Sequence, residues 1–213
     1  MTYRELLAAL DHADIYLIDQ LLRGQITPEM RTLDAGCGGG RNLRLLLQLG
    51  FDVCATDEDP QAVESVCRHA ATHAPTLPAA NFRTEPVERS SFEDETFDVV
   101  ISSAVLHFAE DDARFSAMLQ GTWRMVRPGG MLFCRLASSI GMEDRVTPVA
   151  GRRHRLPDGS DRYLVDEAVL MALTRDLGGE LLDPIKTTVV QDQRCMTTWV
   201  VRKRFTLAVE PER

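Results

Sequence analysis

Hydrophobic residues along the chain follow two spacings, one typical of helices and one typical of buried strands. The helical spacing covers residues 3–22 and is interrupted at 12–14, which allows two helices there. From residue 30 to 137, short apolar runs alternate with amphipathic segments. Strands are expected at 30–35, 51–59, 81–88 (a strand or a strand plus turn), 97–108 and 131–137, and helices at 42–50, 60–74 and 111–126.

This alternation of strand and helix is typical of an α/β fold, because neighbouring parallel strands need a helical crossover. We predict a doubly wound, mostly parallel seven-stranded sheet with helices on both faces, which makes a three-layer α/β/α arrangement. The last two strands, 180–193 and 194–205, should form an antiparallel hairpin at the sheet edge because a short link joins them. A further helix is expected at 165–179, and a tight turn at 127–130.

The length of 213 residues suits one domain, expected over 1–213. Within it, residues 1–27 would form a helical cap. Residues 137–164 follow neither spacing, so they are expected to be an irregular insertion or lid. Either a monomer or a homodimer is compatible with this organisation.

Composition narrows the class of partner and compartment. The formal net charge of -8 disfavours binding to nucleic acid phosphates. The five cysteines are odd in number and form no CxxC pair, so neither a disulfide framework nor a metal site is expected. The N-terminus lacks the continuous apolar core of a signal peptide, and no run approaches the roughly 18 apolar residues of a membrane span. A cytoplasmic protein without membrane attachment is therefore expected.

The stretch LDAGCGGGRN, residues 33–42, is the clearest candidate for a ligand site. Its glycines let the backbone approach a ligand, and the helix that follows offers free N–H groups. Asp57 ends the next strand 21 positions after Gly36 (57 − 36), where a carboxylate can accept both ribose hydroxyls of a nucleoside. Asp34 would repel a pyrophosphate but attract an ammonium or sulfonium. The pattern therefore favours S-adenosylmethionine over NAD.

Four segments in order, LDAGCGGG, ATDED, FDVVISSAVLHF and RPGG, resemble the motifs of class I S-adenosylmethionine-dependent methyltransferases, which are Rossmann-like. The resemblance covers roughly residues 30–135. In addition, GCGGGRN and the sequence Gly50-Phe51-Asp52-Val53 look similar to the tellurite-resistance and thiopurine-type small-molecule methyltransferases. The family resemblance implies in-line transfer of a methyl group, with S-adenosylhomocysteine as product.

The resemblance also implies roles for individual residues. Asp34 and the glycine turn would hold the methionine part of the cofactor, Asp57 the ribose and Glu58 the adenine side. The carbonyl of Ser102 would accept the cofactor's amino group, and residues 104–107 would border the methyl-transfer site. The expected cofactor-binding residues are Asp34, Gly36, Cys37, Gly38, Gly40, Asn42, Asp57, Glu58, Val87, Glu88, Ser102 and Ala104.

One position departs from the family pattern. Pro86 stands where the family often has an aspartate that grips the adenine edge. Three replacements are open: the carboxylate of Glu85, the carboxylate of Glu88, or the N–H of Val87 alone.

The acceptor side is less constrained. His107 is the candidate catalytic residue, as a base or an acceptor-orienting group, with a structural histidine as the alternative. Tyr16 would form a lid or belong to the core. Arg152, Arg155 and Arg194 are candidate acceptor-binding residues, and the alternatives are a solvated basic loop at 151–162 and a strand edge at 194. A small-molecule acceptor is favoured over protein or RNA, and over a non-catalytic nucleoside-binding protein.

Overall fold

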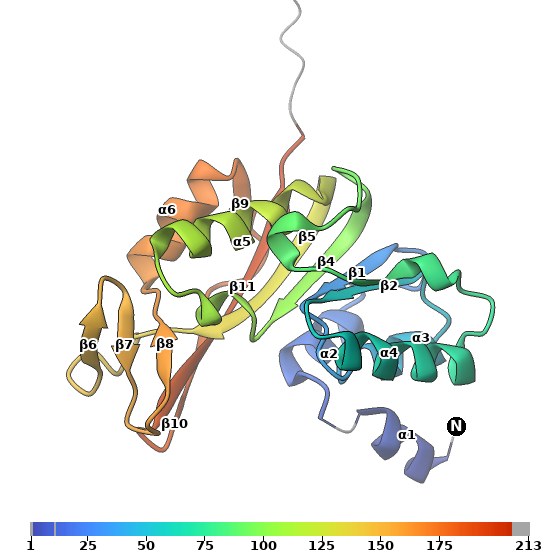
Figure 1. Cartoon of the computed structure of the whole chain (residues 1–213), viewed down its shortest axis with the longest axis horizontal. Helices are drawn as coiled ribbons and strands as arrows, with labels where there is room; N and C mark the ends of the chain where they lie inside the picture. Colours follow the sequence, from blue (N-terminus) through green and yellow to red (C-terminus); the bar gives the residue numbers. More distant parts are fainter. Residues whose placement is uncertain (1, 11, 206–213) are drawn as a thin grey trace, which may run out of the picture.

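A computed structural model describes residues 2–10 and 12–205, and its core is one sheet with the order β10-β11-β5-β4-β1-β2-β3, in which β9 also pairs with β11 (Figure 1). Its strands are β1 (Thr32–Ala35), β2 (Val53–Asp57), β3 (Phe82–Thr84), β4 (Phe97–Ser103), β5 (Val126–Ala137), β9 (Gly179–Leu181), β10 (Lys186–Val190) and β11 (Arg194–Lys203). The first five are parallel to one another. The mostly parallel sheet is therefore confirmed.

The antiparallel end of the sheet is also confirmed, with one strand more than predicted. β10 pairs with β11, and β11 pairs with β5, both antiparallel. The predicted strand at 180–193 is in fact two: β9 pairs with the far end of β11, and β10 begins only at Lys186. Residues 127–130 belong to β5 rather than to a separate turn, and the register of β4 and β5 shifts there.

Helices cover both faces of the sheet, and the central strands are therefore buried on both sides. They are α1 (Tyr3–Leu10), α2 (Ile15–Leu22), α3 (Leu43–Gln48), α4 (Pro60–His73), α5 (Asp112–Arg124) and α6 (Glu167–Asp176), with short 3-10 turns η1 (Ala79–Asn81), η2 (Val87–Arg89) and η3 (Leu106–Phe108). One core cluster joins the sheet to α5 and α6, and a second joins it to α2, α3 and α4. Within residues 2–10 and 12–205, every helix is too short or too polar to cross a membrane.

The N-terminal helices break where the sequence predicted. Asp14 ends the break by accepting a hydrogen bond from the backbone N–H of Tyr16, which caps α2. Gln20 of α2 and Arg23, its C-cap, then donate to the buried carboxylate of Asp183, just before β10. The helical cap is therefore tied to the antiparallel end of the sheet.

The insertion at 137–164 is regular, contrary to the prediction. It contains β6 (Thr147–Ala150), β7 (Arg153–Arg155) and β8 (Asp161–Tyr163), which form a separate antiparallel sheet at one end of the molecule (Figure 1). Each strand has only three or four residues, so no alternation of apolar and polar residues is long enough to recognise in the sequence. β8 packs against η3, which brings this small sheet to the carboxyl end of β4.

Candidate functional site

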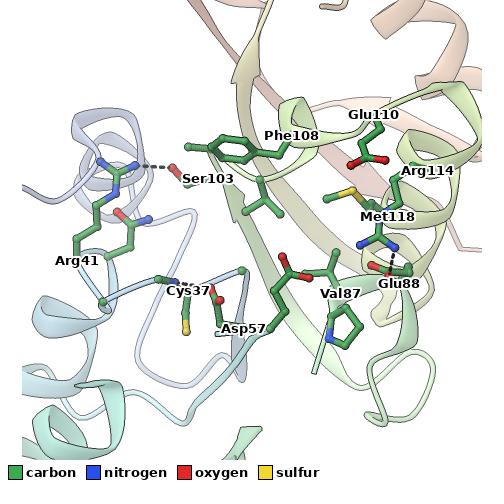
Figure 2. A pocket seen from close by; sticks show the side chains of 18 residues that line it. Cys37, Arg41, Asp57, Val87, Glu88, Ser103, Phe108, Glu110, Arg114 and Met118 are labelled. Atoms are coloured by element: carbon green, nitrogen blue, oxygen red, sulfur yellow. Dashed lines mark hydrogen bonds and ion pairs between the residues drawn. The ribbon is translucent and has the colours of Figure 1, made fainter. Parts of the chain in front are cut away.

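A cavity of about 740 Å³ lies where β1, β2 and β4 end (Figure 2). In a doubly wound sheet the ligand site lies at the carboxyl ends of the strands, at the point where the strand order reverses. Here that point lies between β1 and β4. The expected cofactor residues that line it are Gly36, Cys37, Gly38, Asn42, Asp57, Glu58, Val87, Glu88 and Ala104. Val105, which was expected to border the methyl-transfer site, also lines the cavity. Residues that were not among the expected site residues complete the lining: Gly39, Arg41, Pro86, Ser103, Phe108, Glu110, Arg114 and Met118.

The glycine turn and Asp57 hold each other in place. The Gly38 N–H donates to Oδ2 of Asp57 at 2.8 Å, and the Asp59 N–H donates to Oδ1 at 3.0 Å. Gly38 has a φ of +51°, and a Cβ there would meet no atom within 4 Å, so its missing side chain leaves open space beside the turn. The carboxylate of Asp57 is thus oriented by the backbone at the edge of the cavity.

Gly40, which was expected to contact the ligand, has a different reason to be glycine. It does not line the cavity, and its φ is +80°. A Cβ on Gly40 would lie 2.9 Å from Cγ2 of Val66. The residue therefore serves the packing of the turn against α4.

Asp34 is the least satisfied polar group near the cavity. Its side chain is 1% exposed, at the end of β1, and does not itself line the cavity. Within the described part of the chain, neither carboxylate oxygen has a hydrogen-bond partner. Burial raises the pKa of Asp34 to about 8, and the nearby charge of Arg41 opposes this only in part. Such a group gains most from a cationic ligand.

The structure distinguishes the two carboxylates that were expected as replacements for the missing family aspartate. Glu85 accepts hydrogen bonds from Ser90 and Ser91 and does not line the cavity. Glu88 does line it, pairs with Arg114 of α5, and leaves its Oε2 buried without a partner among the described residues (Figure 2). The backbone of η2 sits directly against Gly121 of α5, where a Cβ would lie 2.6 Å from the Glu88 Cα. Of the two carboxylates, Glu88 is the one at the site.

At the end of β4 the cavity begins one residue later than expected. Ser102 is fully buried and does not line the cavity, whereas Ser103 does. Ala104 follows with a φ of +64°, a conformation that is costly for a residue with a Cβ, and its N–H donates to the carbonyl of Arg135 at 2.7 Å. This strained residue lines both the large cavity and a second one.

The second cavity has a volume of about 340 Å³ and shares Arg41 and Ala104 with the first. Besides these two residues, its lining is His107, Arg135, Ala137, Leu156, Asp158, Ser160, Arg162, Val190, Arg194 and Met196. Four of these residues, Leu156, Asp158, Ser160 and Arg162, come from the part of the insertion that follows β5. The segment expected to be a lid therefore forms one wall of this cavity.

His107 lines the second cavity, but its surroundings argue against a base. The Ala137 N–H donates to Nδ1 at 3.1 Å, so Nδ1 is unprotonated and the neutral ring carries its proton on Nε2. Burial and the charge of Arg162 lower the pKa of His107 to about 4. The ring also lies 4.6 Å from that of Phe108. A neutral hydrogen-bond donor is the form that this geometry favours.

Of the other predicted acceptor residues, Arg194 lines the second cavity, whereas Tyr16, Arg152 and Arg155 line neither of these two cavities. The hydroxyl of Tyr16 is hydrogen-bonded to Thr188 at 2.7 Å, and its ring packs on the second core cluster. Arg152 pairs with Asp166, and Arg155 pairs with Asp161 on the neighbouring strand. These three residues are thus occupied by structural contacts. Among the described residues, no group of three or more His, Cys, Asp or Glu is arranged to hold a metal ion.

Comparison with known proteins places these features in a family context. A family model described as a methyltransferase domain matches residues 33–134. The uncharacterized methyltransferase YodH of Bacillus subtilis is 34% identical over 140 residues, which is 66% of this chain and 52% of that protein. A ubiquinone biosynthesis O-methyltransferase of Methylocella silvestris is 34% identical over 122 residues, 55% of this chain and 45% of that protein. The chain thus spans about half the length of these curated relatives.

A solved structure extends the likeness to nearly the whole fold. The 1,6-didemethyltoxoflavin-N1-methyltransferase of Burkholderia thailandensis, with bound 1,6-didemethyltoxoflavin and S-adenosylhomocysteine, matches with a TM-score of 0.68. The match covers 95% of this chain and 82% of that one at 18% identity. At this identity the likeness is one of fold.

Proposed function

Because residues 33–134 match a methyltransferase domain, we propose that this chain is a class I S-adenosylmethionine-dependent methyltransferase and that it transfers the methyl group of S-adenosylmethionine to a small-molecule acceptor. The observation that carries the proposal is the charge of the larger cavity. Its lining has four carboxylates against two guanidinium groups, those of Arg41 and Arg114; the carboxylates are those of Asp57, Glu58, Glu88 and Glu110. The unpartnered carboxyl group of Asp34 is buried in the strand that leads to it. This surrounding suits a sulfonium and an ammonium and would repel a pyrophosphate.

The polar groups of the cavity fit the separate parts of the cofactor. Each oxygen of Asp57 accepts one backbone N–H and keeps a second lone pair for a ribose hydroxyl. The free Oε2 of Glu88 is an acceptor for the amino group of adenine, in place of the aspartate that Pro86 replaces. Asp34 would receive the ammonium of the methionine part.

When bound, the cofactor supplies an electrophilic methyl group, which the acceptor displaces in line to leave a neutral thioether. The chain's own contribution is orientation and exclusion of water. The acceptor would occupy the second cavity and meet the cofactor at Ala104, which lines both cavities. There His107 would donate its Nε2–H to the acceptor and hold it in place.

The size of the second cavity supports a small acceptor. Its volume of about 340 Å³ is at the lower end of the range for small-molecule sites. Two similar proteins carry names that refer to small-molecule reactions, in ubiquinone biosynthesis and on didemethyltoxoflavin. A macromolecular acceptor would need an exposed approach to the methyl group, whereas the insertion forms a wall at this place.

The proposal is tested by incubating the protein with S-adenosylmethionine labelled in its methyl group and with separated small-molecule, protein and RNA fractions of a cell extract. We expect label in the small-molecule fraction and none with Asp57→Ala, while the variant of the neighbouring residue, Asp59→Ala, retains activity. Label found only in protein or RNA would refute the small-molecule acceptor. Binding of S-adenosylhomocysteine without labelling of any fraction would instead indicate a non-catalytic binding protein.

A further inference from the structure

The second cavity has the opposite charge to the first. Four arginines line it, from four separate parts of the chain: Arg41, Arg135, Arg162 and Arg194. Asp158 is the one carboxylate in its lining. The remaining wall includes the apolar side chains of Leu156, Val190 and Met196. The lining of this cavity is therefore basic and partly apolar.

The contacts of these arginines show which of them lack a carboxylate partner. Arg135 donates to the buried carboxylate of Asp14 at 3.1 Å, so its charge is compensated. Arg41 donates to neutral oxygens, the Ser103 hydroxyl and a backbone carbonyl. Arg162 likewise donates to a backbone carbonyl, and its guanidinium lies 4.8 Å from the centre of the Phe108 ring.

Within the described residues, no ion pair engages Arg41, Arg162 or Arg194. The pKa of Asp158 is lowered, against the effect of burial, first by the hydrogen bonds that it accepts from Ser160 and to a smaller extent by the charges of Arg194 and Arg162. Neither arginine is within ion-pair distance of it among the described residues. Three uncompensated arginines against one carboxylate leave an excess of two positive charges. An anion is the ligand that would balance them.

Two arginines of the insertion that do not line the cavity have carboxylate partners. Arg152 pairs with Asp166, the N-cap of α6, and Arg155 pairs with Asp161 on β8. Arg162 differs from these two, because it lines the cavity and has no ion pair among the described residues.

From the excess of positive charge in this cavity we infer that the methyl acceptor is a small organic anion, and that its carboxylate or phosphate group binds to Arg162 and Arg194. This inference rests on the proposed function. The apolar body of the acceptor lies against Leu156, Val190 and Met196, and its nucleophilic atom points toward Arg41 and Ala104, where the two cavities join. Guanidinium groups bind both kinds of anion through paired N–H donors.

A direct test measures binding by calorimetry on the full chain saturated with S-adenosylhomocysteine. The probes are benzoate, phenyl phosphate and neutral benzamide, which share a ring and differ in charge. We expect at least one of the two anions to bind at least tenfold more tightly than benzamide. That preference should fall at least tenfold in Arg162→Gln and in Arg194→Gln.

The matched control is Arg155→Gln, which removes the same charge from the same small sheet but outside the cavity; it should leave anion binding unchanged. Equal binding of benzamide and the anions, no binding of any probe, or an unchanged preference in both cavity variants would overturn the inference. In each of these cases, retained binding of S-adenosylhomocysteine would leave the proposed function standing. Loss of S-adenosylhomocysteine binding by the unmodified chain would instead refute the proposed function.

Discussion

The buried carboxylate of Asp34 gives the sharpest quantitative prediction, because its cost to the ligand-free protein can be worked out. Burial raises its pKa from 3.8 to about 8. Between about pH 4 and pH 8 the folded protein therefore holds one proton more at this site than the unfolded chain, so stability falls as the pH rises through this window. At about 1.4 kcal/mol for each pH unit, the cost of ionising Asp34 has an upper limit of about 6 kcal/mol.

The Asp34→Asn variant keeps the size of the side chain but cannot ionise. We expect the free energy of unfolding of the unmodified protein, relative to this variant, to fall by at least about 2 kcal/mol between pH 5 and pH 8.5. Urea unfolding of both proteins without cofactor measures this difference. Two parallel pH profiles would refute the reasoning, since they would mean that the carboxylate is hydrated or partnered.

The same carboxylate links cofactor binding to a proton. When the ammonium of the ligand approaches Asp34, the pKa of Asp34 should drop and the Asp34 carboxyl group should release its proton. Calorimetric titration with S-adenosylhomocysteine at pH 7, in buffers of different ionisation enthalpy, should report release of about one proton from the unmodified protein and none from Asp34→Asn. Equal proton release by the two proteins would show that the ligand does not address this carboxylate.

Three other variants test separate parts of the structure. Hydrogen bonding by Arg23 lowers the pKa of Asp183 to about 2, so Asp183→Asn should lower the free energy of unfolding by about 2 kcal/mol at pH 7. Urea unfolding should show this difference shrinking as the pH falls from 4 to 2, and a constant difference would contradict the prediction. Gly121→Ala should lower the free energy of unfolding by about 1–3 kcal/mol, because the added methyl group overpacks against η2, and should weaken S-adenosylhomocysteine binding. Gln120→Ala, at an exposed position of the same helix, should do neither. Unchanged thermal stability of Gly121→Ala would contradict the close approach of η2 and α5. Because the pKa of His107 is lowered to about 4, the pH profile of kcat/KM should show no step near pH 6.5 from this group. A step near pH 6.5 that disappears in His107→Gln would instead show that His107 acts as a catalytic base.

Much of the cofactor side could be predicted from the sequence, because its residues lie at strand ends. A parallel sheet brings the carboxyl ends of β1, β2 and β4 to one edge, so the glycine turn, Asp57 and Ala104 had to meet there. Boundaries limited the accuracy: β4 presents Ser103 rather than Ser102 to the cavity. Local partners limited it too, since two serines engage Glu85 and leave Glu88 at the site.

The acceptor side could not be predicted in the same way, because it depends on contacts between distant segments. The basic stretch was recognised as a candidate, but which of its arginines would be neutralised depends on partners such as Asp166 and on the pairing of β7 with β8. The three short strands that decide this have no readable periodicity. Similarly, the tautomer of His107 depends on a backbone N–H 30 positions away, in β5.

The central claim, that the larger cavity holds S-adenosylmethionine, is tested most directly by calorimetric titration of the full chain with S-adenosylhomocysteine and, separately, with NADH. We predict micromolar affinity for S-adenosylhomocysteine, weakened at least tenfold in Asp57→Ala and unchanged in Asp59→Ala, and no binding of NADH. Binding of NADH without binding of S-adenosylhomocysteine would contradict the claim.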